Sequence, residues 1–271
     1  MLCSILLMLL TLLHALTLRV FAADCYDDWF CIELDRQQGK AVITNITEFP
    51  VVVVTVNGEW RNIQGKVQRF LKTVDLNNSL PVTLFNLERK HKQIVRSFNY
   101  SARWVHGVLL AEHDPLAEYY NPLAPDQRYW LVQGFNGAFS HYGASRYAVD
   151  FAMPVGTPVM AARGGVVIDT EARFNKRGAS RCYARYANYV VILHDDGTTG
   201  EYYHLQQHGV NVERGQQVVT GQLIGFSGNT GFSSLPHLHF AVYQALLDGK
   251  FQSIPFEFST QPIKKETSTA D

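Results

Sequence analysis

Residues 236–243 read PHLHFAVY, and this stretch decides the fold class of the carboxyl-terminal half. In a β-strand, successive side chains point to opposite faces, so residues two apart share a face. One face would then carry Leu238, Phe240 and Val242, which suit a core. The opposite face would carry His237, His239 and Tyr243. Two imidazoles held side by side on the non-core face of a strand fit a metal site or proton transfer.

Two other segments repeat this pattern. In Tyr147–Ala152, the apolar stripe would comprise Tyr147, Val149 and Phe151. Asp150 would then point away from this stripe. The segment 200–205 reads GEYYHL and brings His204 near the end of a strand, after a hairpin signal at Asp195–Thr198. From Tyr129 onward, frequent glycines and short strands predict an all-β domain.

The amino-terminal half has a different sequence pattern, in which short apolar runs alternate with turn residues. The predicted strands are Trp29–Leu34, Lys40–Ile46, Pro50–Val56, Val82–Leu87 and Gln93–Trp104. The predicted turns lie at Gly39, Asn57-Gly58 and Asn77-Asn78. This pattern predicts a small antiparallel β-sandwich. The region has no cluster of His, Cys and carboxylate residues, so we expect it to bind or position rather than to catalyse.

The chain opens with a Leu-rich run that ends in small residues, which predicts a secretory signal peptide and hence export to the periplasm or the extracellular space. In chain order we expect a signal peptide (1–23), a β-sandwich accessory domain (24–106), a connection (107–128), a catalytic β domain (129–258) and a flexible tail (259–271). In an oxidising compartment, Cys25 and Cys31 are close enough in sequence to form a local disulfide. Cys182 is left over and has no sign of an activated thiol around it.

The 271 residues include 24 basic and 24 acidic side chains, and 46% of the chain is hydrophobic. Removing residues 1–23 would take away only Arg19, which leaves 23 basic and 24 acidic residues. This balance argues against a nucleic-acid partner, and the apolar content argues against disorder. We expect no stable membrane insertion once the signal has been removed.

The carboxyl-terminal half gathers most of the histidines, and with Asp150 they suit a divalent transition metal. A catalytic zinc site uses three protein ligands and leaves a fourth position for water. Residue types and strand periodicity leave open which member of the His237/His239 pair would bind the metal.

Three blocks of sequence resemble the lysostaphin-type (LytM-like) zinc endopeptidases: SHYGASRYAVDFAMPVGTPVMAARGGVV (140–167), GEYYHL (200–205) and GFSGNTGFSSLPHLHF (225–240). The resemblance implies an all-β peptidase core, one zinc ion per chain and peptidoglycan peptides as substrate. It implies that the zinc ligands are His141, Asp150 and His239. It also implies that His204 and His237 form the catalytic pair. The spacing from His141 to Asp150 is longer than in the compact members.

Because the chain has no HExxH helix, the usual glutamate base is missing and a neutral histidine would take its place. Three further residues are expected at the substrate groove: Asn229, Tyr142 and Tyr243. For Asn229, an ordinary tight loop is an equal alternative.

Two other functions compete with this hypothesis. A non-catalytic relative that binds the cell wall or activates another hydrolase could retain the zinc site, although all five motif positions are present here. A biotin- or lipoate-carrier module would need a lysine at a hairpin tip, and the sequence between Val212 and Gly231 contains none.

Overall fold

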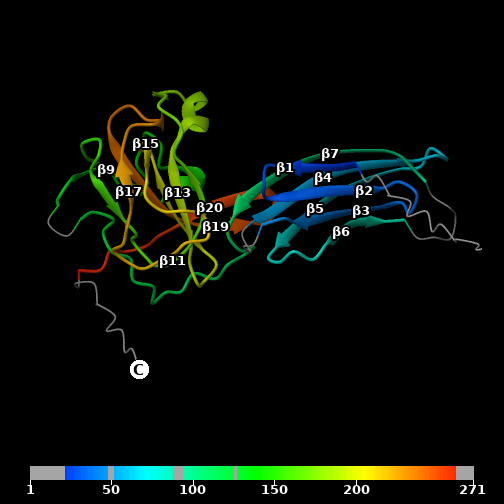
Figure 1. Ribbon diagram of the computed structural model, residues 1–271, viewed down its shortest axis with the longest axis horizontal. Coiled ribbons are helices and arrows are strands. Elements are labelled where there is room, and N and C mark those ends of the chain that lie inside the picture. Colours follow the sequence, from blue (N-terminus) through cyan, green and yellow to red (C-terminus); the bar gives the residue numbers. More distant parts are fainter. Residues whose placement is uncertain (1–21, 48–51, 88–93, 125–126, 261–271) are drawn as a thin grey trace, which may run out of the picture.

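The computed structural model describes residues 22–47, 52–87, 94–124 and 127–260 (Figure 1). The expected signal peptide and tail lie almost entirely outside the described residues. The described part consists of β-strands, loops and a few turns of 3-10 helix, which confirms the all-β prediction. No helix in this part is long and apolar enough to cross a membrane.

The amino-terminal strands form two antiparallel sheets. The first has the order β1 (Ala22–Tyr26), β2 (Phe30–Asp35), β3 (Lys40–Asn45) and β6 (Val82–Asn86). The second has the order β5 (Val67–Leu76), β4 (Val52–Asn62) and β7 (Val95–His106). A disulfide joins Cys25 to Cys31, which are paired directly across β1 and β2. Cys182 is an exposed free thiol.

One predicted turn is wrong. Asn57 and Gly58 lie inside the long strand β4, paired on one side with β5 and on the other with β7. A Cβ atom at Gly58 would lie 2.6 Å from Cζ of Phe70 and 3.1 Å from Cε2 of Phe98. The glycine therefore makes room for aromatic rings from the two neighbouring strands rather than allowing the chain to reverse.

The carboxyl-terminal half is built on one large sheet. Its order is β16 (Gln217–Val218), β11 (Gly165–Glu171), β13 (Tyr189–Leu193), β14 (Thr199–Tyr203), β19 (His237–Leu246), β9 (Val149–Ala152) and β8 (Trp130–Gln133), with β20 (Lys250–Ile254) also paired to β19. A smaller sheet has the order β10 (Pro158–Met160), β17 (Leu223–Ser227) and β15 (Leu205–Val210). Short elements complete this half: β12 (Arg177–Gly178), β18 (Gly231–Phe232), η2 (Gly143–Ser145), η3 (Arg181–Tyr186) and η4 (Leu247–Gly249).

The main core lies between the large sheet and the smaller one. The buried residues of the PHLHFAVY strand that enter this core are Leu238, Phe240 and Val242. They meet apolar residues of the smaller sheet and its neighbours, among them Val159, Leu205 and Ile224. The predicted alternation of this strand is thereby confirmed, and its histidines face away from the core.

The amino-terminal sheets pack against the face of the large sheet that carries His239. Cα partners across adjacent strands share a face, and the pairs Val191–Glu201 and Glu201–Ala241 form one such row. Val191 belongs to the apolar cluster that also contains Trp29 and Phe30 of the amino-terminal region. The end of β7 lies at the same cavity as the histidines. Figure 1 shows both amino-terminal sheets extending away from the carboxyl-terminal half.

Candidate functional site

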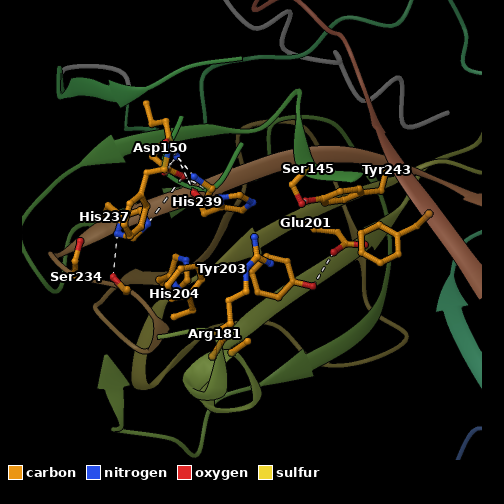
Figure 2. Close-up of a pocket in the computed structure, with 18 of the residues that line it drawn as sticks. Ser145, Asp150, Arg181, Glu201, Tyr203, His204, Ser234, His237, His239 and Tyr243 are labelled. Atoms are coloured by element: carbon orange, nitrogen blue, oxygen red, sulfur yellow. Dashed lines mark hydrogen bonds and ion pairs between the residues drawn. The ribbon is translucent and has the colours of Figure 1, made fainter. Parts of the chain in front are cut away.

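A cavity of about 490 Å³ opens on the histidine-bearing face of the large sheet (Figure 2). Its walls include apolar side chains from separate loops, among them Phe139, Phe232 and Leu235. Trp104, Val105 and His106 at the end of β7 also line it, so the amino-terminal sheets contribute to its wall. The cavity is a groove between two parts of the chain that are far apart in sequence, and pockets at such junctions commonly bind ligands.

Three side chains meet at one end of this groove. Asp150 on β9 and His239 on β19 are direct register partners, and His141 precedes η2. Oδ1 of Asp150 lies 2.9 Å from Nδ1 of His239 and 3.1 Å from Nε2 of His141. One potential ligand atom from each residue lies within 4.8 Å of the others. The structure thus brings together the three residues that the family resemblance implied as zinc ligands.

The buried side chain of His141 shows why a cation fits here. Nδ1 lies 2.9 Å from the carbonyl oxygen of Gly134, which can only accept, so Nδ1 carries the proton. In the neutral imidazole, Nε2 then presents a lone pair, and it has no hydrogen-bond partner in the described part of the chain. This lone pair faces Oδ1 of Asp150, so the two electron-rich atoms repel each other. A cation bound between them would be a ligand partner for both atoms and would replace the repulsion by attraction.

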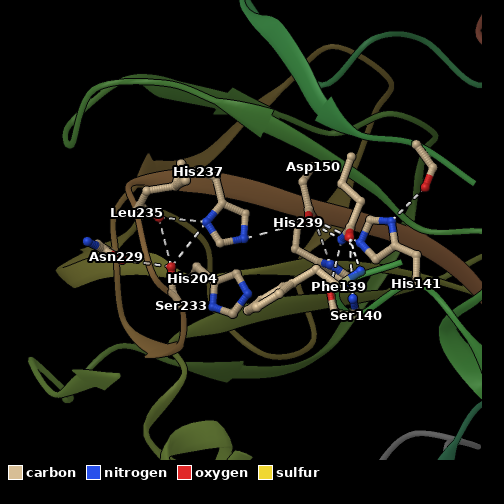
Figure 3. A network of polar contacts seen from close by, with 12 residues as sticks. Phe139, Ser140, His141, Asp150, His204, Asn229, Ser233, Leu235, His237 and His239 are labelled. Atoms are coloured by element: carbon tan, nitrogen blue, oxygen red, sulfur yellow. Dashed lines mark hydrogen bonds and ion pairs between the residues drawn. The ribbon is translucent and has the colours of Figure 1, made fainter. Parts of the chain in front are cut away.

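Asp150 is held in place from its other side. Nε2 of Gln133 on β8 donates to Oδ2 of Asp150 at 2.9 Å and to Oγ of Ser140 at 2.8 Å. Figure 3 shows Asp150, His141 and His239 within this network of polar contacts. Burial disfavours the carboxylate, but the surrounding imidazoles, among them that of His239 through its Nδ1, outweigh burial and hold the pKa of Asp150 well below its usual 3.8. The side chain is therefore ionised, as a metal ligand must be.

The other two motif histidines lie beside this set. Nδ1 of His204 lies 2.7 Å from the carbonyl oxygen of Thr230, and Nδ1 of His237 lies 2.7 Å from that of Leu235. Both Nδ1 atoms must therefore donate, which leaves the Nε2 lone pairs available to accept a proton. The two ring centroids are 4.5 Å apart, and Nε2 of His237 lies 3.9 Å from Oδ1 of Asp150.

Burial is the main reason why both rings are uncharged. It lowers the pKa of His204 well below 6.5, and the neighbouring His237 and His239 lower it further. It also lowers the pKa of His237, although Asp150 and the Leu235 carbonyl oppose the shift. Two neutral imidazoles beside a potential cation site can act as proton acceptors at neutral pH.

His204 reaches the groove through an unusual backbone conformation. Strict alternation along β14 would place it on the face opposite to Glu201 and Tyr203. The residue instead has a φ of 67°, in the left-handed region, between the end of β14 and the start of β15. Such conformations cost about 1–3 kcal/mol for residues other than glycine and cluster at functional sites.

The three predicted groove residues occupy different positions. Tyr243 lines the cavity, and its hydroxyl lies 3.1 Å from Oγ of Ser145. Tyr142 is exposed and is not among the lining residues, but its hydroxyl accepts a hydrogen bond from Arg181, which lines the cavity. Asn229 is not among the lining residues; its buried side chain lies 2.7 Å from Oγ of Ser233, which does line the cavity.

Gln133 and Glu201 are site residues that sequence reasoning missed. The role of Gln133 can be recognised only from the pairing of β8 with β9, which brings Gln133 next to Asp150. Glu201 lies two residues before Tyr203 on β14, and the same period of two that singled out the HxH pair would have placed Glu201 on the groove face.

Comparisons with known proteins identify relatives of the carboxyl-terminal half. Residues 144–252 match the sequence model of Peptidase family M23. The chain is 36% identical over 141 residues to the peptidoglycan DD-endopeptidase ShyA of Vibrio cholerae, covering 51% of this chain and 29% of ShyA. It is 39% identical over 99 residues to lysostaphin of Staphylococcus simulans, covering 36% of this chain and 18% of lysostaphin.

A solved structure of lysostaphin from Staphylococcus simulans superposes with a TM-score of 0.35 and 32% identity, over 47% of each chain. In the sequence comparisons, the matched part of the chain spans less than a third of the length of ShyA and of lysostaphin. The matched segment holds Asp150, His204 and the HxH pair. Residues 144–252 are thus similar to peptidase family M23.

Proposed function

We propose that this chain is an exported zinc metalloendopeptidase that hydrolyses amide bonds in the peptide part of peptidoglycan. The arrangement that carries the proposal is the pair of neutral imidazoles of His204 and His237 beside the donor set of His141, Asp150 and His239. Metal ligands and proton acceptors thus share one end of a groove that is large enough for a peptide segment.

The donor set suits zinc. Two imidazole nitrogens and one carboxylate oxygen match the ligands of catalytic zinc sites, whereas calcium and magnesium prefer oxygen ligands alone. A zinc ion bound here would lower the pKa of its bound water to about 7 and polarise the scissile carbonyl group. We assign His141, Asp150 and His239 to hold it, at one ion per chain.

His204 and His237 would handle the proton. With each Nδ1–H fixed to a backbone carbonyl, each Nε2 can accept a proton from the attacking water and later return it to the leaving amine. General acid–base catalysis of this kind contributes typically about 10²–10⁴-fold. Ser233 lies 3.1 Å from Nδ1 of His237 and helps to orient that ring.

The substrate class rests on the names of relatives, since ShyA is named a peptidoglycan DD-endopeptidase. The groove is compatible with it, because Phe139 and Phe232 stack at 5.6 Å and form an apolar wall for a peptide backbone. Export rests on the Leu-rich start of the chain and on the Cys25–Cys31 disulfide, which an oxidising compartment would maintain. We assign residues 24–106 to an accessory β domain, 107–128 to a connection and 129–258 to the peptidase.

The alternative is a relative that retains zinc but only binds the cell wall or activates another hydrolase. Purified zinc-loaded protein is incubated with purified sacculi, and released fragments are identified by mass. Soluble peptides with a newly cut amide bond support the peptidase. One zinc per chain, together with binding to sacculi but no cut bond, would favour the alternative.

A further inference from the structure

The groove contains a second polar cluster that the proposed peptidase chemistry does not use. Figure 2 shows the imidazoles at one end and Glu201, Ser145 and Tyr243 at the other. The carboxylate of Glu201 accepts a hydrogen bond from the Tyr203 hydroxyl at 2.7 Å and one from Oγ1 of Thr199 at 3.0 Å. Glu201 and Tyr203 both line the cavity, so the carboxylate is oriented by neutral donors and faces the groove.

The carboxylate of Glu201 has no ion-pair partner among the described residues. None of their Lys, Arg or His side chains forms an ion pair with Glu201 within 4.0 Å. An ionised carboxylate offers about four acceptor positions, and the two hydrogen bonds from the protein leave part of this capacity unused. Because Glu201 is half-buried, its negative charge is less well solvated than a surface charge, and a cation supplied by a ligand would compensate it.

Besides the motif histidines, two basic side chains line the cavity, and each contacts partners other than Glu201. Nε2 of His106 lies 3.2 Å from Asp169, which also accepts from the Tyr189 hydroxyl at 2.8 Å. Burial opposes a charge on His106, but the contact with Asp169 and the more distant charge of Glu201 raise its pKa overall. A protonated His106 offsets only one of these two carboxylates, and its ion-pair contact is with Asp169, so one negative charge remains. On the other wall, Arg181 donates to the Tyr142 hydroxyl at 2.6 Å and lies over its ring.

We propose that Glu201 is a specificity-determining residue of the groove and binds a free ammonium group on the peptide substrate. Tyr203 and Thr199 hold the carboxylate in position, and Trp104 at the end of β7 lines the same cavity. The accessory sheets thus help to shape the part of the groove that selects the substrate. That the ligand is a peptide rests on the proposed function, whereas the preference for an ammonium group follows from the unpaired carboxylate.

The test compares two forms of one substrate. Peptide fragments isolated from sacculi are divided, and the free amino groups of one half are acetylated, which removes their positive charge. The zinc-loaded full chain should cleave the free-amine peptides with a kcat/KM at least about tenfold higher, as the loss of a charge-assisted hydrogen bond implies. In Glu201→Gln, which keeps the shape and removes the charge, this ratio should fall to within about twofold of unity. The exposed Glu213 provides the matched control, and Glu213→Gln should keep the ratio of the unmodified protein.

A binding measurement separates this proposal from the proposed function. Calorimetric titration of the full chain in the presence of a chelator, with the same two peptide pools, requires no turnover. Weaker binding of the acetylated pool to the unmodified protein, with no such difference in Glu201→Gln, supports the ammonium site even if the chain cleaves nothing. Equal preference in the unmodified protein and Glu201→Gln, in turnover and in binding, would overturn it.

Discussion

Oδ1 of Asp150 lies 2.9 Å from Nδ1 of His239, although 89 residues separate the two in the sequence. The pairing of β9 with β19 creates this contact, because the two residues are direct register partners. The same carboxylate oxygen faces His141, so one atom connects all three proposed metal ligands.

Replacing His239 by alanine should therefore abolish metal binding. Loss of one of three protein ligands leaves too few donors to hold zinc against water, and the zinc content should fall from about one ion per chain to below about a tenth. Elemental analysis of purified, dialysed protein measures this. His208→Asn is the control, because His208 is exposed and has a φ of 57°, which asparagine tolerates. Retention of full zinc content by His239→Ala would assign the metal to other residues.

Replacing His237 should separate chemistry from metal binding. His237→Ala removes a proton acceptor but none of the three proposed ligands, so zinc content should be kept while kcat falls by about 10²–10⁴-fold. Release of soluble peptides from sacculi measures the rate, and elemental analysis of the same preparation measures the metal. Parallel loss of zinc and activity in this variant would make His237 a ligand rather than a catalytic residue.

Gln133 should matter for metal affinity although it is not a ligand. Its amide nitrogen donates to Oδ2 of Asp150, and its amide oxygen accepts from the backbone N–H of Phe139 at 3.0 Å. Gln133→Ala leaves the three ligands in place but removes the group that orients the carboxylate, so zinc should bind about 10–100-fold more weakly. Competition with a chromophoric chelator gives the dissociation constant. An unchanged constant would show that the strands alone fix Asp150.

The sequence predicted those parts of the site that follow from local periodicity. The alternation in PHLHFAVY placed Leu238 and Phe240 in the core and the two histidines on the other face. Periodicity within one strand does not show which strands become neighbours, so the contact of Gln133 with Asp150 could not be predicted from it. It also failed at His204, where one left-handed residue breaks the alternation and turns the side chain into the groove.

The same limit explains the error at Gly58. Asn-Gly is a strong turn signal when only neighbours in sequence are considered. Here the space beside the missing Cβ is occupied by Phe70 from β5, which approaches to 2.6 Å from where the atom would lie. Packing between strands that are distant in sequence thus overrode the local preference. The position of the amino-terminal sheets against the groove face depends on similar long-range contacts, such as those of Val191 with the amino-terminal cluster.

His194 should make folding stability depend on pH, outside the proposed catalytic groups. It is buried, its Nδ1 lies 2.8 Å from the carbonyl oxygen of Gly164, and Nε2 has no hydrogen-bond partner in the described part of the chain. Burial lowers the pKa of His194 from 6.5 to about 4, with the Gly164 carbonyl opposing the shift. Between these two values the unfolded chain binds the proton and the folded chain does not. The free energy of unfolding should therefore fall as the pH is lowered from 6.5 towards 4, by roughly 3 kcal/mol at most.

His194→Asn isolates this effect, because asparagine keeps a short side-chain donor for the Gly164 carbonyl but does not titrate. Other groups also titrate at low pH, so the quantity to compare is the difference between the two proteins in urea unfolding at a series of pH values. The variant should be less stable at pH 7, since it loses the packing of the ring against Tyr119, whose centroid lies 5.8 Å away. This deficit should shrink as the pH falls, because only the unmodified protein loses the contribution of a buried neutral imidazole. Parallel stability curves for the two proteins between pH 6.5 and 4 would mean that His194 is protonated in the folded chain as readily as in the unfolded one.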